Sequence, residues 1–114
     1  PDKRRLTIDM FIAQVVGKSM EPTIPDGSWC LFRPDQGGSR NGKIVLVESR
    51  HITDLETMKS YTIKRYFSEK IVTEDTFRHI KIILRPDNKD FQDIVLENVQ
   101  EGDFHVVAEF VAVL

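Results

Sequence analysis

Short runs of β-branched and aromatic residues, separated by turn residues, recur along the whole chain and constrain its fold more than any other feature. The clearest run covers residues 78–84, where Ile80, Ile82 and Leu84 occupy alternate positions and so share one face of a strand. Short runs bounded by Gly, Pro, Asn and Asp are typical of an all-β protein. We therefore expect strands over residues 6–16, 28–33, 42–47, 61–67, 78–84, 94–96 and 104–114.

Helical patterning is limited to residues 19–23. Glu21 and Pro22 suit the first turn of a helix, because proline lacks the N–H group that such a turn leaves unpaired. The sequence thus predicts a mostly β fold of short twisted strands, with one short helical turn at this point.

Length and composition narrow the class of protein. The chain has 114 residues, of which 40% are hydrophobic and 30% charged, and this is typical of one soluble globular domain. A net charge of −2 argues against direct nucleic-acid binding by this domain. No apolar run reaches the about 20 residues of a membrane helix.

Cysteine and histidine, the usual nucleophiles and metal ligands, show no motif. The one cysteine, Cys30, excludes a disulfide within the chain. It lies in an apolar run, so we expect a buried side chain, with a Cys-His nucleophile as the alternative. The spacing of His51, His79 and His105 indicates no metal site, and no cofactor is expected.

Ser19 follows a strand and a glycine, in the segment Gly17-Lys18-Ser19-Met20. A serine on a sharp turn at a strand end can present its hydroxyl group beside outward-facing backbone N–H groups, which is the arrangement that stabilises an oxyanion. Taken alone, the pattern also fits an ordinary turn or helix cap.

Lys64 interrupts an apolar strand, between Ile63 and the aromatic residues that follow. A lysine acts as a general base only if its pKa falls from about 10.4 toward about 7–8. Burial has this effect, because it disfavours the charged ammonium. A strand lysine that faces solvent is the simpler interpretation of the residue alone.

Five motifs set these two residues in an ordered pattern that covers most of the chain. They are Ser19-Met20-Glu21-Pro22-Thr23-Ile24 with Asp26-Gly27, residues 41–47, Ile63-Lys64-Arg65, residues 84–94 (Leu-Arg-Pro-Asp-Asn followed by Phe91 and Ile94), and residues 106–111. Their order and spacing resemble the LexA, UmuD and phage-repressor peptidases, a group related to signal peptidases.

The resemblance implies a Ser-Lys dyad, with Ser19 as nucleophile and Lys64 as general base. It also implies that the backbone N–H groups of Lys18 and Ser19 form the oxyanion hole, and that the fold is the mostly antiparallel β-fold of these peptidases. Residues 1–114 are then expected to be one serine endopeptidase domain, the C-terminal part of a longer protein.

The resemblance further implies a cytoplasmic repressor or SOS stress-response regulator that cleaves itself. The expected substrate is a polypeptide, including the protein's own N-terminal region, and a RecA filament is the expected trigger. The scissile Ala-Gly or Cys-Gly pair of self-cleaving repressors does not occur in the 114 residues, so we expect no cut within them.

Two other functions remain open from the sequence. A signal peptidase is the alternative enzyme, although the Gly-Asp pair expected after its Lys-Arg motif is replaced here by Tyr66-Phe67. A non-catalytic dimerisation or sensor module is the alternative that is not an enzyme.

A homodimer is expected in any of these cases. Residues 104–114 are apolar at nearly every position, broken only by His105 and by Glu109 near the middle. They form either a central strand covered on both faces or an exposed edge or face that pairs with a second copy.

Overall fold

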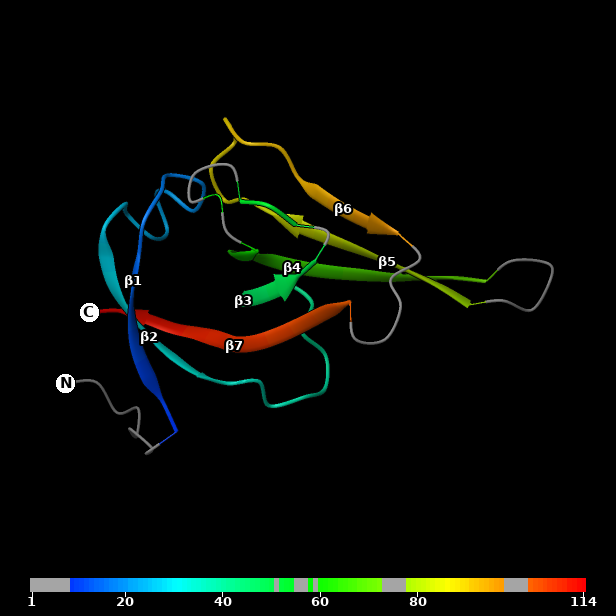
Figure 1. The fold of residues 1–114 in the computed structure, drawn as a ribbon, viewed down its shortest axis with the longest axis horizontal. Coiled ribbons are helices and arrows are strands. Elements are labelled where there is room, and N and C mark those ends of the chain that lie inside the picture. Colours follow the sequence, from blue (N-terminus) through cyan, green and yellow to red (C-terminus); the bar gives the residue numbers. More distant parts are fainter. Residues whose placement is uncertain (1–8, 51, 55–57, 59, 73–77, 98–102) are drawn as a thin grey trace.

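The fold is one antiparallel sheet of seven strands (Figure 1). The computed structural model describes residues 9–50, 52–54, 58, 60–72, 78–97 and 103–114. The strands are β1 (Phe11–Val15), β2 (Ser28–Pro34), β3 (Ile44–Ser49), β4 (Tyr61–Val72), β5 (Arg78–Arg85), β6 (Ile94–Glu97) and β7 (Phe104–Val113). The predicted mostly β class is confirmed, and each expected run contains a strand. Residues 6–8 of the first run lie outside the described residues.

The strand order in the sheet is β1-β2-β7-β3-β4-β5-β6, which places the C-terminal strand near the middle. β7 pairs with β2 on one side and with β3 on the other. The interpretation of residues 104–114 as an exposed edge is therefore wrong, and their central position in the sheet is confirmed. Val106 and Ala108 are buried, whereas Val113 is exposed, so the middle of the strand is covered and its C-terminal end is not. The exposed face that pairs with a second copy stays a prediction.

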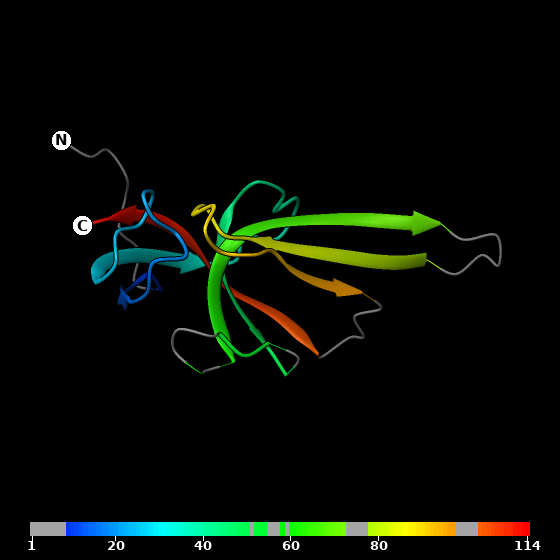
Figure 2. The same ribbon diagram turned by 90° about the horizontal axis from the view of Figure 1, so that it is seen from above.

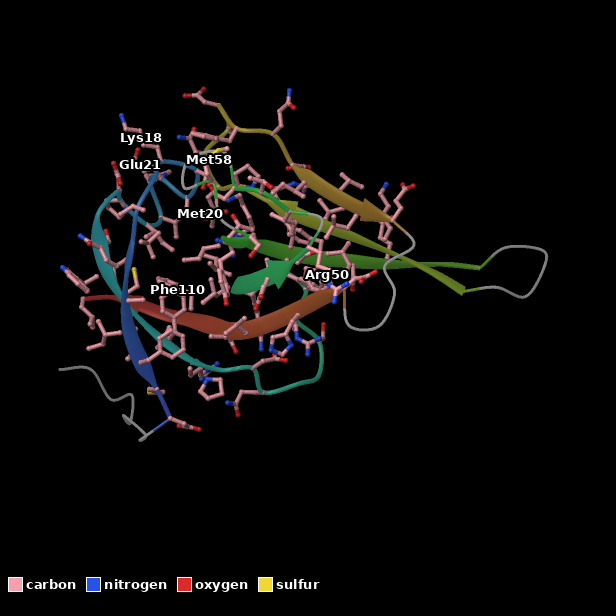
Figure 3. All side chains as sticks on the ribbon, in the orientation of Figure 1. Lys18, Met20, Glu21, Arg50, Met58 and Phe110 are labelled. Atoms are coloured by element: carbon pink, nitrogen blue, oxygen red, sulfur yellow. The ribbon has the colours of Figure 1, made fainter. Side chains whose placement is uncertain are left out.

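Two clusters of buried side chains form the core, and β7 contributes to both. Ala108 belongs to the first, with Val15, Met20, Ile24, Cys30, Phe32 and Ile44. Val106 belongs to the second, with Val45, Val47, Ile52, Tyr66, Ile82 and Leu84. The first cluster lies beneath the segment that carries Ser19, so this turn is anchored by the apolar residues that follow it. Figure 3 labels both the exposed Lys18, at the outer edge of this turn, and the buried Met20, nearer the strands.

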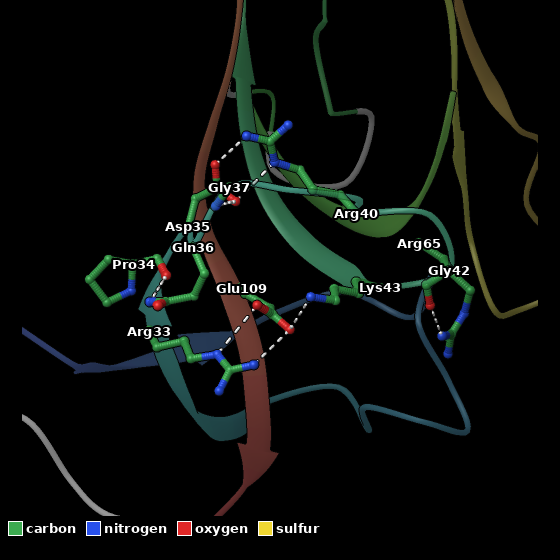
Figure 4. A network of polar contacts seen from close by, with 10 residues as sticks. All are labelled: Arg33, Pro34, Asp35, Gln36, Gly37, Arg40, Gly42, Lys43, Arg65 and Glu109. Atoms are coloured by element: carbon green, nitrogen blue, oxygen red, sulfur yellow. Dashed lines mark hydrogen bonds and ion pairs between the residues drawn. The ribbon is translucent and has the colours of Figure 1, made fainter. Parts of the chain in front are cut away.

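Glu109, the charged residue within β7, is nearly buried but paired with cations. Arg33 of β2 donates to both of its carboxylate oxygens, at 3.0 and 3.3 Å, and Lys43 Nζ lies 3.6 Å away (Figure 4). Lys43 lies in the connection between β2 and β3, and in this connection Arg40 pairs with Asp35. Buried charge is tolerated where it is paired and hydrogen-bonded, so Glu109 is compatible with a central strand.

β4 links the two halves of the sheet. Its first part, residues 61–65, pairs with β3, and its second part, from Arg65 to Val72, pairs with β5. Figure 2 shows the bend in β4 and the long β4–β5 hairpin that extends beyond the other strands. This pairing carries β4 past the predicted end at Phe67, and it places Lys64 and Arg65 where the strand changes partners.

The expected helical turn after Ser19 is present as a single turn that does not continue, because the described residues there form successive turns and no helix. One bond of helical spacing is present, in which the Ile24 N–H donates to the Met20 carbonyl at 2.9 Å. The next donor in a helix would be Pro25, which has no N–H group, so the pattern stops after one bond.

No helix in the part of the chain that the structure describes is long and apolar enough to cross a membrane.

Candidate active site

The turn that carries Ser19 depends on two glycines and an aspartate. Gly17 has a φ of 103° and Gly27 a φ of 83°, a backbone region that favours glycine. The Gly17 N–H donates to Asp26 Oδ1 at 2.7 Å, which ties the two ends of the turn together. The glycines and the aspartate of this motif therefore have a structural role. They let the chain reverse between β1 and β2 and leave Ser19 partly exposed.

Lys64 points into the protein from β4. Alternate residues of a strand share a face, and Thr62, Lys64 and Tyr66 all lie on the buried face. Only 5% of the surface area of Lys64 is exposed to solvent, so the solvent-facing interpretation of this lysine is wrong. Burial without hydrogen bonds would be costly for an amine, and the position therefore requires polar partners.

The structure brings the two predicted residues together. Lys64 Nζ lies 3.1 Å from Ser19 Oγ, although the residues are far apart in the sequence. It also donates to Thr62 Oγ1 at 2.8 Å and to the Ile63 carbonyl at 3.1 Å. A neutral amine has two N–H groups and one lone pair. If Thr62 and Ile63 accept the two hydrogens, the lone pair faces the Ser19 hydroxyl.

Asp54 is a site residue that the sequence did not reveal. The Thr62 hydroxyl donates to Asp54 Oδ2 at 2.7 Å, so its lone pairs are left to accept from Lys64. The same Oδ2 atom lies 3.8 Å from Lys64 Nζ, and its side chain is only 14% exposed. Burial destabilises the ammonium of Lys64, whereas the Asp54 carboxylate stabilises it.

The connection between β5 and β6 secures the other side of the nucleophile turn. Asp87 accepts two hydrogen bonds from Arg65, at 2.8 and 2.9 Å, and one from the Thr23 hydroxyl at 2.6 Å. The hydrogen bonds from Arg65 hold the pKa of the Asp87 carboxyl below its usual value, with a smaller effect from Thr23. Asp87 is thus an ionised anchor between β4 and the Ser19 turn.

Two cavities flank the pair, and both border Ser19, Asp54 and Lys64. The first has a volume of about 420 Å³ and is mainly apolar beyond these residues, with Val15, Val16, Met20, Leu46 and Ile63 in its wall. The second, of about 330 Å³, is lined in addition by Thr53, Asp90, Phe91, Gln92 and Ile94. A chain bound at Ser19 therefore lies next to both cavities.

The alternative nucleophile, Cys30, is outside this site. Its side chain is fully buried in the first core cluster, as expected. Burial raises the pKa of the Cys30 thiol, which keeps it protonated and a poor nucleophile. The described side chains include no group of three or more His, Cys, Asp or Glu residues that could hold a metal ion. His51 lies outside the described residues.

Comparison with protein families gives a match over most of the chain. A model of the Peptidase S24-like family matches residues 5–111, which is nearly the whole chain and includes Ser19, Lys64 and Asp87. A comparison with curated proteins found no significant match. The chain therefore belongs to the Peptidase S24-like family, the serine peptidase family of LexA, UmuD and the phage repressors.

Proposed function

We propose that this protein is a serine endopeptidase in which Ser19 is the nucleophile and Lys64 the general base. The observation that carries the proposal is the 3.1 Å separation of Lys64 Nζ and Ser19 Oγ at a buried lysine. A base must lie within hydrogen-bond reach of the proton it removes, and this distance satisfies that condition. The family match adds that serine peptidase chemistry occurs in relatives of this chain.

The reaction follows from the positions of the two groups. Neutral Lys64 takes the Ser19 hydroxyl proton as Oγ bonds to the substrate carbonyl carbon, and the carbonyl electrons move to oxygen. The C–N bond then breaks, the amine leaves with the proton from Lys64, and an acyl ester remains on Ser19. Water attacks this ester and gives a proton to Lys64. The bond between the acyl carbon and Oγ then breaks, Lys64 returns the proton to Ser19 Oγ, and the acid is released. The N–H groups of Lys18 and Ser19 are proposed to stabilise the oxyanion.

The proposed substrate is an extended polypeptide that occupies both cavities. The scissile bond lies over Ser19, with substrate residues on the two sides of that bond in the 420 and 330 Å³ cavities. The apolar wall of the first favours small or apolar side chains. As in LexA-like relatives, the substrate is proposed to be the protein's own N-terminal region in a cytoplasmic regulator, with a RecA filament as trigger.

Cleavage of a mixed peptide library, followed by mass spectrometry, tests this function for substrates of any sequence. We expect new termini with the wild-type protein and none with Ser19→Ala or Lys64→Met, which keep the approximate shapes. Ser28→Ala removes a hydroxyl that bonds the Pro25 carbonyl outside the site, and it should cleave normally. Wild-type protein that cuts no peptide at any pH from 6 to 10 would support the non-catalytic alternative. Cutting only of secretory precursors in detergent would indicate a signal peptidase.

A further inference from the structure

The turn between β5 and β6 holds the backbone of the nucleophile turn at two adjacent carbonyl groups. Asn88 Nδ2 donates to the Lys18 carbonyl at 2.9 Å, and the Asn88 backbone N–H donates to the Ser19 carbonyl at 3.0 Å. These contacts join segments that are distant in the sequence. They involve the backbone of the nucleophile turn, whereas the Ser19 side chain contacts Lys64.

Holding a carbonyl also fixes the N–H of the same peptide group. A trans peptide is planar, and its C=O and N–H bonds point in opposite directions. The Lys18–Ser19 peptide is trans, and its carbonyl accepts from Asn88 and, at 3.1 Å, from the Glu21 N–H. The bond from Asn88 therefore fixes the direction of the Ser19 N–H together with a bond inside the turn. That N–H is one of the two groups proposed above to stabilise the oxyanion.

The orientation of the Asn88 side chain is set by a second bond. Asn88 Oδ1 accepts from the Asp90 N–H at 3.0 Å, which leaves the Nδ2 group directed at Lys18. The residue before it, Asp87, is bound by Arg65, the neighbour of Lys64. The turn that contains Asp87 and Asn88 therefore contacts the backbone at Lys18 and Ser19, and it reaches Lys64 through the neighbouring Arg65.

We propose that Asn88 is a positioning residue for the reaction: its side-chain amide fixes the Lys18–Ser19 peptide so that the Ser19 N–H faces the developing oxyanion, and the Asp87–Arg65 pair holds Asn88 in register with Lys64. This inference rests on the proposed function. It assigns a mechanistic reason to the Pro-Asp-Asn sequence at residues 86–88, which contributes no group to the dyad.

Two substitutions separate this role from a purely structural one. Asn88→Asp keeps the acceptor that closes the turn on the Asp90 N–H, but it replaces the donor to Lys18 by a carboxylate oxygen. Asn88→Ala removes both bonds. If the residue only shapes its turn, the Asp variant is the milder of the two. If the donor to Lys18 matters, the Asp variant reacts at least as slowly as the Ala variant. Asn41→Ala is the matched control, because the Asn41 side chain also accepts from a backbone N–H, that of Ser68, far from Ser19 in the sequence.

The experiment measures the reaction of Ser19 with a small alkyl fluorophosphonate at increasing reagent concentrations. In this reaction Ser19 Oγ bonds to phosphorus, the P–F bond breaks, fluoride leaves, and the hydroxyl proton passes to Lys64. We expect both Asn88 variants to lower the maximal rate about 10- to 100-fold, as small misplacements of reacting groups do. The half-saturating concentration and the pH at half-maximal rate should be unchanged, and Asn41→Ala should react as the wild type does.

The outcomes separate the two proposals. Wild-type protein that fails to react at Ser19 contradicts the proposed function itself. If the wild type reacts normally and both Asn88 variants react at the wild-type rate, only the positioning role is contradicted. A rate loss that is smaller for Asp than for Ala, or that follows the loss of thermal stability across all three variants, also contradicts it.

Discussion

At the scale of the residue, the central feature is a buried lysine whose partners are arranged around a serine hydroxyl. The motifs identified Ser19 and Lys64, and the strand alternation placed Thr62 on the same face as Lys64. Asp54 was beyond prediction, because its contact with Thr62 depends on how the connection between β3 and β4 folds back. No local pattern in that polar segment distinguishes it from its neighbours.

Asp54 should set the pH range of the reaction. Its carboxylate favours the ammonium form of Lys64, so Asp54→Asn should lower the pH at half-maximal rate by about 1–3 pH units, the effect typical of a close opposite charge. An asparagine can still accept the Thr62 hydrogen bond. The measurement is the rate of Ser19 modification by fluorophosphonate between pH 5 and 11.

The control for that substitution is Asp90→Asn. Among the residues that the structure describes, the titratable ones that line the two cavities are Asp54, Tyr61, Lys64 and Asp90. Asp90 is exposed, and solvent screens exposed charges, so its removal should leave the profile in place. Equal shifts for the two variants would show that net charge, and not the contact with Lys64, controls the profile.

At the scale of the element, alternation predicted where the strands lie but not how they associate. Each predicted run contains a strand, and the apolar density of residues 104–114 agreed with a central position. The helical turn is limited to one bond of helical spacing, because Pro25 has no N–H group that could continue the pattern after Ile24. The extension of β4 arises from its pairing with β5, which the side-chain pattern of either strand alone does not specify.

The Arg65–Asp87 pair, which joins β4 to the turn between β5 and β6, should make part of the stability sensitive to acid. Since the pKa of Asp87 is lowered in the folded protein, its contribution is complete above the unfolded pKa of about 3.9. It is lost as the pH falls through the folded value. Near neutral pH, Asp87→Asn should reduce the free energy of unfolding by about 1.5–3 kcal/mol, the range for hydrogen bonds to charged groups.

Urea unfolding at pH 7 and at pH 3 measures this effect, because the difference between wild type and variant should shrink in acid. Asp93→Asn is the matched control, since Asp93 also pairs with an arginine, Arg85, but both side chains are more exposed. Exposed pairs contribute about 0–1 kcal/mol. A constant difference at both pH values would contradict an ionised Asp87 anchor.

At the scale of the whole molecule, exposed apolar side chains occur on strands at one end of the sheet. The exposed fractions of the surface areas of Ile12 and Trp29 are 58% and 54%. The register pairs Ile12 with Leu31 and Leu31 with Ala112, which puts these residues and Trp29 on one face of β1, β2 and β7. Apolar faces of this kind are usually covered by a partner, so a homodimer that includes the C-terminal strand remains our proposal.

Sedimentation from about 1 to 200 μM, a range over which moderate self-association is detected, tests the dimer. We expect a concentration-dependent dimer in the wild type and a monomer with Trp29→Glu. Phe91→Glu is the control, because Phe91 is an exposed aromatic residue at the opposite end of the strand order, before β6. A wild-type protein that stays monomeric throughout, or a dimer that survives Trp29→Glu, would contradict this interface.

The most direct test of the central claim is the pH dependence of Ser19 modification in the wild type and in Lys64→Met, with the modified residue located by mass spectrometry. If neutral Lys64 activates Ser19, the wild-type rate rises with pH and reaches a plateau once the amine is deprotonated. The Lys64→Met protein, folded as judged by its melting curve, should react at least 100-fold more slowly, in line with about 10²–10⁴-fold for general-base catalysis. A wild-type rate that is flat from pH 6 to 10, or a Lys64→Met rate close to that of the wild type, would contradict the dyad.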